Sequence, residues 1–277
     1  MGHHNIKFSG DPYSDSGVWG ASTSRANFCE EDYAVTFYLA EFINALSNYA
    51  YIHLALRAIY PPPTKPQPLL TRLLNPKPDF MSLSLLILGI GSFLFHATLR
   101  QTLEFVDEFS MLGLTWSMLQ ASLTARQSPT RARAISIALA VAYFSFSAFY
   151  LWSGKIIYQV FAFVGALLGV LARSQWTFHF MRPALPEKES RDWNWRTWKA
   201  LGWCLVGYGL WSVDLEFCAE LRAVKAALGL PWAWGLELHG WWHVLTAVGA
   251  AQAMQVAREV REFGERERES TINAKEK

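Results

Sequence analysis

The sequence has little charge for its length. Only 17% of its 277 residues are Asp, Glu, Lys or Arg, whereas soluble domains use about a quarter. Apolar residues make up 52% and aromatic residues 15%, including 13 tryptophans and 18 phenylalanines. A water-facing globule of this size would lack the polar side chains that cover its surface. The composition therefore favours a protein whose main solvent is the lipid bilayer.

Cysteine and clustered basic charge are also scarce. Three cysteines exclude a disulfide scaffold and leave room for one bridge. The net charge is only +2, and the basic residues do not gather with aromatic ones along a stripe, so we expect no nucleic acid partner. The first 33 residues have neither the apolar core nor the cleavage signature of a signal peptide. We expect the first helix to insert uncleaved.

Long apolar runs, by contrast, are abundant. A helix needs about 20 mainly apolar residues to cross a hydrocarbon core of about 30 Å. Seven segments meet this requirement: 34–56, 80–99, 104–124, 134–153, 156–178, 197–217 and 235–257. We therefore predict an all-α membrane protein, a seven-transmembrane helix bundle. Its parts are a terminal segment at 1–33, the bundle at 34–257 and a charged tail at 258–277.

Lysine and arginine fall unevenly on the two sides of this bundle. Nineteen lie in the tail and around the connections after the first, third and fifth helices, and six lie at the N-terminus and in the other connections. Because cytoplasmic loops keep an excess of these residues, we expect the N-terminus in the lumen and the C-terminus in the cytosol. The proline-rich connection 61–78 predicts an extended cytosolic spacer. The alternating charges from residue 258 predict a frayed helix or a disordered exit segment.

Three histidines lie at one predicted depth, in the lumenal half of the membrane. His239 and His243 are four residues apart, which places both rings on one helical face, as in two-histidine zinc sites. The pair alone is equally compatible with histidines that hydrogen-bond at the membrane interface. His96 reaches the same depth and would leave a fourth zinc position for water, as in catalytic sites. The remaining histidines are interpreted as surface or interface residues: His3, His4, His53 and His179.

Two more polar side chains are expected at this depth. Ser92 precedes His96 by one helical turn, where its hydroxyl can contact a zinc-bound water or a reacting carbonyl oxygen. Taken alone, Ser92 would be interpreted as a helix-packing serine. Asp107 lies in the first turns of a predicted membrane helix, where a carboxylate needs a cationic or metal-associated partner. Both residues are therefore candidates for catalysis.

Four sequence motifs resemble those of the alkaline ceramidases. They are GSFLFHATL at 91–99, FVDEFSM at 105–111, NFCEEDYAVTFYLAEFINALSN at 27–48 and LHGWWHVLTAVG at 238–249. The resemblance extends over all seven predicted helices, and the insertions are similar to those of fungal members. Members of this family are seven-helix zinc amidohydrolases of the endoplasmic reticulum and Golgi. The resemblance departs at Ala162, where members often carry tyrosine, although Tyr158 lies one turn earlier on the same face.

The resemblance implies an enzyme and assigns roles to residues. Zinc would be held by His96, His239 and His243, with Asp107 moving the proton and Ser92 holding the water or the oxyanion. The expected reaction is hydrolysis of the ceramide amide to a fatty acid and a sphingoid base, possible in reverse, in the endoplasmic reticulum or Golgi membrane. The expected partners are a ceramide-type substrate and membrane lipids.

Two other classes compete with this interpretation. A seven-helix receptor or signalling protein of the same superfamily would carry a structural zinc, but the adiponectin receptor relatives keep their N-terminus in the cytosol. A proton-relaying transporter would place charges along a path to both faces of the membrane. The charges here cluster at one depth.

A second metal, calcium, is predicted near the N-terminus. Asn27, Glu30, Asp32 and Glu41 offer oxygen ligands together with the Phe28 carbonyl, and hard oxygen ligands suit calcium. For the run of carboxylates alone, an acidic cap on the first helix is the preferred explanation. Calcium is favoured by Glu41, predicted two turns inside the helix, where an unpaired carboxylate is costly. The family resemblance also implies calcium, and neighbouring Glu31 is expected to point away.

One disulfide is predicted from the topology. Cys29 lies on the N-terminal segment, and Cys218 lies just past the lumenal end of the sixth predicted helix. Both would face an oxidising compartment at the same level, so we predict a bridge between them. Cys204 falls within a helix and should remain a packed thiol.

Overall fold

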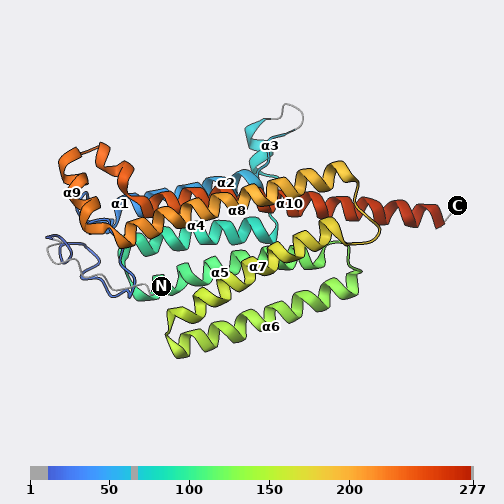
Figure 1. Cartoon of the computed structure of the whole chain (residues 1–277), viewed down its shortest axis with the longest axis horizontal. Coiled ribbons are helices and arrows are strands. Elements are labelled where there is room, and N and C mark those ends of the chain that lie inside the picture. The colour runs from blue at the N-terminus through green and yellow to red at the C-terminus, as the bar shows by residue number, and fades with distance from the viewer. Residues whose placement is uncertain (1–11, 64–67, 276–277) are drawn as a thin grey trace. The chain divides into compact units, whose positions relative to one another are not determined.

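The computed structural model describes residues 12–63 and 68–275, and this part of the chain contains helices and no β-strand beyond one isolated bridge (Figure 1). The all-α class is confirmed. In chain order the helices are α1 (Phe42–Ser47), α2 (Tyr49–Ile59), α3 (Leu69–Leu73), α4 (Phe80–Thr98), α5 (Gln101–Thr124), α6 (Pro129–Ser153), α7 (Ile156–His179), α8 (Glu187–Glu216), α9 (Cys218–Leu228), the short 3-10 helix η1 (Trp232–Leu236) and α10 (Leu238–Lys275).

Each predicted membrane segment contains helix. The pair α1 and α2 occupies the first segment, and α4, α5, α6, α7, α8 and α10 occupy the others. Among the described residues, α4, α6 and α7 are long and apolar enough to cross a membrane on length and composition alone. The chain therefore has the character of a membrane protein. Seven crossings and a lumenal N-terminus remain predictions.

The first helix of the described chain begins at Phe42, whereas the first predicted segment begins near residue 34. The residues before it pair with the end of α4: Ala40 N–H donates to the Ala97 carbonyl at 2.9 Å, and Glu41 N–H donates to the His96 carbonyl at 3.0 Å. These bonds replace those of a helix. Glu41 is the N-cap of α1, so the prediction that it lies two turns inside the helix is wrong.

The proline-rich connection, predicted to be extended, contains a short helix, and the tail, predicted to be a frayed helix or disordered, is helical. α3 interrupts the proline-rich connection in a run free of proline, with Pro68 at its N-cap position. α10 continues through the charged tail to Lys275. Val256 and Val260, one turn apart, are buried there against Trp193, and Phe263 packs on the same cluster. This apolar face, hidden among the alternating charges, holds the tail helical.

The chain forms two compact units. Unit 1 comprises Met1–Met111 and Leu201–Gly249, and unit 2 comprises Leu112–Ala200 and Ala250–Lys277. In unit 1, α4 packs against α1 and α2. Gly89 permits this close approach, because a Cβ there would lie 2.8 Å from Ile52 and 2.9 Å from Tyr51. In unit 2, the core includes Phe178 and Trp193.

A disulfide between Cys29 and Cys218 ties the N-terminal segment to the start of α9, with the two Cα atoms 5.3 Å apart. This confirms the predicted pairing, and Cys204 is a free thiol. Beside the bridge, Phe28 belongs to an apolar cluster with Phe95 and other buried residues. The N-terminal segment therefore lies against the end of α4, where His96 is found.

Candidate metal centre and active site

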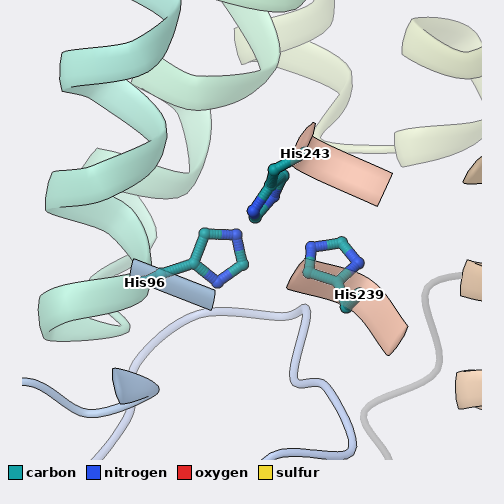
Figure 2. Close-up of side chains that lie close together, drawn as sticks. All are labelled: His96, His239 and His243. Carbon is teal, nitrogen blue, oxygen red and sulfur yellow. The ribbon is translucent and has the colours of Figure 1, made fainter. Parts of the chain in front are cut away.

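Three histidine side chains meet inside unit 1 (Figure 2). His96 lies in the last turn of α4, and His239 and His243 lie in the first two turns of α10. All three are buried, with at most 4% of their surface exposed. One ring nitrogen from each lies within 4.8 Å of the others, the only such group of three or more histidines, cysteines or acids in the described part of the chain. The structure thus brings together the predicted zinc ligands.

Glu41 orients the first of these histidines. Its Oε2 atom lies 2.5 Å from His96 Nδ1, and both side chains are buried. A carboxylate accepts, so Nδ1 of His96 donates and Nε2 keeps its lone pair. In the described structure Nε2 is buried and has no hydrogen-bond partner, while the other two histidine rings lie 5.1 and 4.8 Å away by centroid. A buried lone pair among imidazoles fits a metal ion.

Aromatic rings surround the histidines. Phe28 stacks on His239 with ring centroids 3.8 Å apart. Trp211 meets the same histidine edge-on at 5.5 Å. These contacts limit the rotation of His239 and exclude water from one side, which strengthens electrostatic interactions at the centre. The ring of Phe28 is a contact that sequence reasoning missed, because only its carbonyl was considered.

Ser92 and Asp107 form a hydrogen-bonded pair. Ser92 is 2% exposed and lies one turn before His96 on α4. The Oδ1 atom of Asp107 is buried and has no hydrogen-bond partner among the described residues. Asp107 also lies within electrostatic range of Tyr51, whose ring centroid is 6.2 Å from that of His243. Tyr51 therefore lies near both Asp107 and the histidine centre. The Oδ1 atom of Asp107 stays available to accept a hydrogen bond.

The residues predicted to bind calcium are buried, except for half-buried Asn27, and several of them hydrogen-bond to backbone. Glu30 accepts from the N–H groups of Ile43 (2.6 Å) and Asn44 (2.8 Å), in the first turn of α1. Asn27 Oδ1 accepts from Phe28 N–H at 2.8 Å. Glu30 therefore caps α1, as the alternative interpretation of these carboxylates expected.

The carboxylate of Glu30 nevertheless lies among other acids in a buried segment. Glu30, Asp32 and Glu41 are all at most 5% exposed, whereas Glu31 is exposed, as predicted. Burial, together with the carboxylates of Glu237 and Glu41, raises the pKa of Glu30 well above its ordinary value. A cation at this place would relieve the repulsion. The three acids do not converge as tightly as the histidines do.

Asp214 is a structural residue that sequence reasoning missed. Its side chain is 1% exposed and accepts from Cys29 N–H at 3.3 Å and from Leu238 N–H at 3.2 Å. It thereby fixes the start of α10, one residue before His239. Nearby, a buried ion pair joins Lys225 to Glu237 at 2.9 Å. An acid inside the predicted helix 197–217 was a usable signal, because intramembrane carboxylates require partners.

The remaining histidines do not join this centre. His53 and His179 are exposed, in agreement with the sequence interpretation. His3 and His4 lie outside the described residues.

Comparison with known proteins identifies the family. The ceramidase family profile matches residues 20–275. The chain belongs to the ceramidase family. Among curated ceramidases, it is 28% identical over 249 residues to alkaline ceramidase YPC1 of Saccharomyces cerevisiae, covering 84% of this chain and 75% of the relative. It is 26% identical over 243 residues to alkaline ceramidase 3 of Mus musculus, covering 84% and 82%.

A third ceramidase, the alkaline ceramidase of Arabidopsis thaliana, is 36% identical over 104 residues, covering 38% of this chain and 37% of that one. At the position where the resemblance departs, Tyr158 is 36% exposed and its ring lies 5.0 Å from that of Phe149 by centroid. Tyr158 belongs to unit 2, whereas the histidines belong to unit 1.

Proposed function

We propose that the protein is a zinc-dependent amidohydrolase that cleaves the amide bond of ceramide within the membrane. The products are a free fatty acid and a sphingoid base. The proposal rests on the group of three buried histidines beside the Ser92–Asp107 pair, in a chain of the ceramidase family. Buried ligands inside an apolar chain suit a substrate that stays in the lipid phase.

His96, His239 and His243 would hold the zinc. When bound, zinc supplies a Lewis acid for the amide carbonyl and makes water a stronger nucleophile at neutral pH. The free Oδ1 of Asp107 accepts the proton that water loses as its oxygen adds to the carbonyl carbon. The same carboxyl then delivers the proton to the amide nitrogen as the C–N bond breaks. Ser92 donates its one hydroxyl proton to the Asp107 carboxylate and holds it in place. Once Asp107 carries the proton from water, the Ser92 hydroxyl is released to donate to the developing oxyanion.

Both products remain in or near the membrane, where water is scarce. Condensation of the two products by the reverse steps is therefore part of the proposal. The chain would cross the membrane of the endoplasmic reticulum or Golgi seven times, with the histidine centre in the lumenal half.

The test uses purified protein with labelled ceramide, before and after removal of metal by a chelator. Activity should disappear with the zinc and return when zinc alone is added. Asp107→Asn should lower kcat by about 10²–10⁴-fold with zinc retained, because it removes the base and no ligand. The matched control is Asp192→Asn, an acid whose side chain is 58% exposed in unit 2.

Three outcomes count against this proposal. Turnover that survives complete removal of metal would exclude the zinc mechanism. Loss of zinc in Asp107→Asn would indicate that Asp107 is itself a zinc ligand. A protein that keeps zinc but never cleaves ceramide would favour the receptor interpretation.

We also propose that calcium binds to Asn27, the Phe28 carbonyl, Glu30, Asp32 and Glu41. Binding would neutralise buried carboxylates and stiffen the segment that packs against His96. Calcium should then raise the melting temperature, by an amount that grows with its concentration above Kd.

The calcium test compares neighbouring acids. Glu41→Ala and Asp32→Ala should lose the calcium response, and Asp32→Ala is the cleaner variant because Glu41 also bonds His96. Exposed Glu31→Ala should keep the response. If calcium changes neither the thermal stability nor the turnover of the wild-type protein, these acids act only as a helix cap.

A further inference from the structure

The surroundings of His243 point to a residue that sequence reasoning left aside. Ser47 is the last residue of α1, and its Oγ lies 2.8 Å from His243 Nδ1. His243 is 3% exposed, and its ring lies beside the other two histidines in Figure 2. The contact joins residues 196 positions apart in the chain.

The proton count at Ser47 fixes the direction of this hydrogen bond. A serine hydroxyl has one proton, and Ser47 Oγ also lies 2.8 Å from the Asn44 carbonyl. A carbonyl can only accept, so the hydroxyl proton goes to Asn44. Toward His243 the serine oxygen must therefore accept. Nδ1 of His243 then carries the ring proton, and Nε2 keeps its lone pair.

The backbone of Asn44 is a second hydrogen-bond partner of His243. It hydrogen-bonds the His243 ring, while its N–H donates to Glu30 Oε2 at 2.8 Å. Because the N–H is engaged, the group that meets His243 is the carbonyl, which accepts. His243 thus meets two acceptors, and the one whose contact is on Nδ1 is the Ser47 hydroxyl oxygen.

We propose that Ser47 is a positioning residue that holds His243 in its Nδ1–H tautomer and so presents Nε2 to the zinc. The inference rests on the proposed function, because it concerns the metal which that function requires. Ser47 accepts a hydrogen bond from Nδ1 of His243, as Glu41 does from Nδ1 of His96, but the acceptor is a neutral hydroxyl and not a carboxylate. Ser47 therefore fixes orientation without adding a negative charge beside the metal.

The first test reads the tautomer in the wild-type protein. Metal-free protein labelled with ¹⁵N-histidine, in lipid nanodiscs at alkaline pH, should give His243 a protonated Nδ1 and an unprotonated Nε2. The His243 signals are assigned by their absence from His243→Gln. A wild-type His243 protonated at Nε2 would overturn the proposal, and this measurement requires neither bound zinc nor a foldable Ser47 variant.

The second test measures zinc affinity by competition with a chelator. Ser47→Ala should bind zinc about tenfold more weakly, the low end of the range for residues that support a ligand, because the Asn44 carbonyl remains. Its ¹⁵N spectrum should show both His243 tautomers. The melting temperature of the metal-free variant separates weaker binding from misfolding.

The matched control is Ser84→Ala. The Ser84 hydroxyl is buried in α4 of unit 1 and donates to the Phe80 carbonyl at 2.8 Å, as Ser47 donates to Asn44, but it is not part of the histidine centre. Zinc affinity in Ser84→Ala should stay within about twofold of wild type, far below the effect expected for a ligand-supporting residue. Equal losses in both variants, or wild-type affinity in Ser47→Ala, would reject the role of Ser47.

The outcomes separate this inference from the proposed function. If the wild-type protein binds no zinc, the proposed function fails, and the tautomer in the metal-free protein still decides the inference. If zinc binds and drives turnover while Ser47→Ala matches wild type, only the inference fails.

Discussion

α4 and α7 are equally apolar but have different surroundings. The most apolar stretch of each has a mean hydropathy of 1.9, and that of α6 has 1.8. Yet 61% of the α4 stretch is buried inside the protein, against 6% for α6 and for α7. Hydropathy therefore identifies helices suited to a membrane without telling which of them face protein.

Small and polar residues make the difference. One side of α4 presents buried Ser82, Gly89, Ser92 and His96, whereas apolar residues such as Ile87 are exposed on the other. α6 buries only Tyr150. In lipid, apolar side chains gain little by leaving the tails, so close packing and hydrogen bonding decide which face turns inward.

The largest effect is expected when a histidine on α4 and a histidine on α7 are each replaced. His96→Ala should lose zinc and ceramide hydrolysis, because it removes a ligand whose Nε2 has no other partner. His179→Ala, on exposed α7, should keep both. Zinc content by mass spectrometry and release of labelled fatty acid measure the pair. Retained zinc in His96→Ala would break the comparison.

A leucine pair should give an intermediate effect. Leu85 on α4 is completely buried, and Leu168 on α7 is 58% exposed. Leu85→Ala should lower the free energy of unfolding by about 2–4 kcal/mol through the cavity that it leaves. Leu168→Ala should change it by less than about 0.5 kcal/mol. Unfolding in mixed micelles measures both, and equal effects would show that α7 is covered by protein.

The smallest effect concerns Glu259, on α10 in unit 2. Burial raises its pKa, but hydrogen bonds from Arg196 (2.6 Å) and Trp193 (2.8 Å) together lower the pKa below 4.5. Its contribution to stability is therefore full above pH 4.5 and is lost as the pH falls through the lower folded value.

Glu259→Gln should reduce stability near neutral pH by less than about 1 kcal/mol, since the pair is partly exposed. The difference from wild type should shrink below pH 4.5. Melting curves from pH 7 to pH 3.5 test this sign, with exposed Glu262→Gln as control. A difference that grows in acid would contradict the assignment.

The features that could be predicted from the sequence are those set by the geometry of one helix or by the order of the predicted crossings. The spacing of His239 and His243 is a property of one helix, and the shared level of Cys29 and Cys218 follows from the order of crossings. The partners of the ligands could not be predicted, because Glu41 lies 55 residues from His96 and ordinary helical serines resemble Ser47. Which of them meets a ring nitrogen depends on how α1 and α10 pack.

The errors in the helix boundaries have the same origin. The segment before Phe42 is apolar enough for a helix, but its N–H groups reach the end of α4 instead. In the tail, attention to alternating charge hid the apolar spacing of Val256 and Val260, which a distant Trp193 covers. In both places a contact with a remote part of the chain outweighed the local pattern.

The wide separation of the metal ligands also sets an order of events during synthesis. Cys29 leaves the ribosome 189 residues before its partner, a delay of roughly 10–40 s at about 5–20 residues per second. Glu41 and His96 are likewise synthesised well before His239 and His243, and until α10 is made they lack the helix that completes the group of three histidines. A metal held by all three histidines could therefore be captured only at the end of biogenesis. A chain that stops before His239 contains most of the protein but only one of the three histidines.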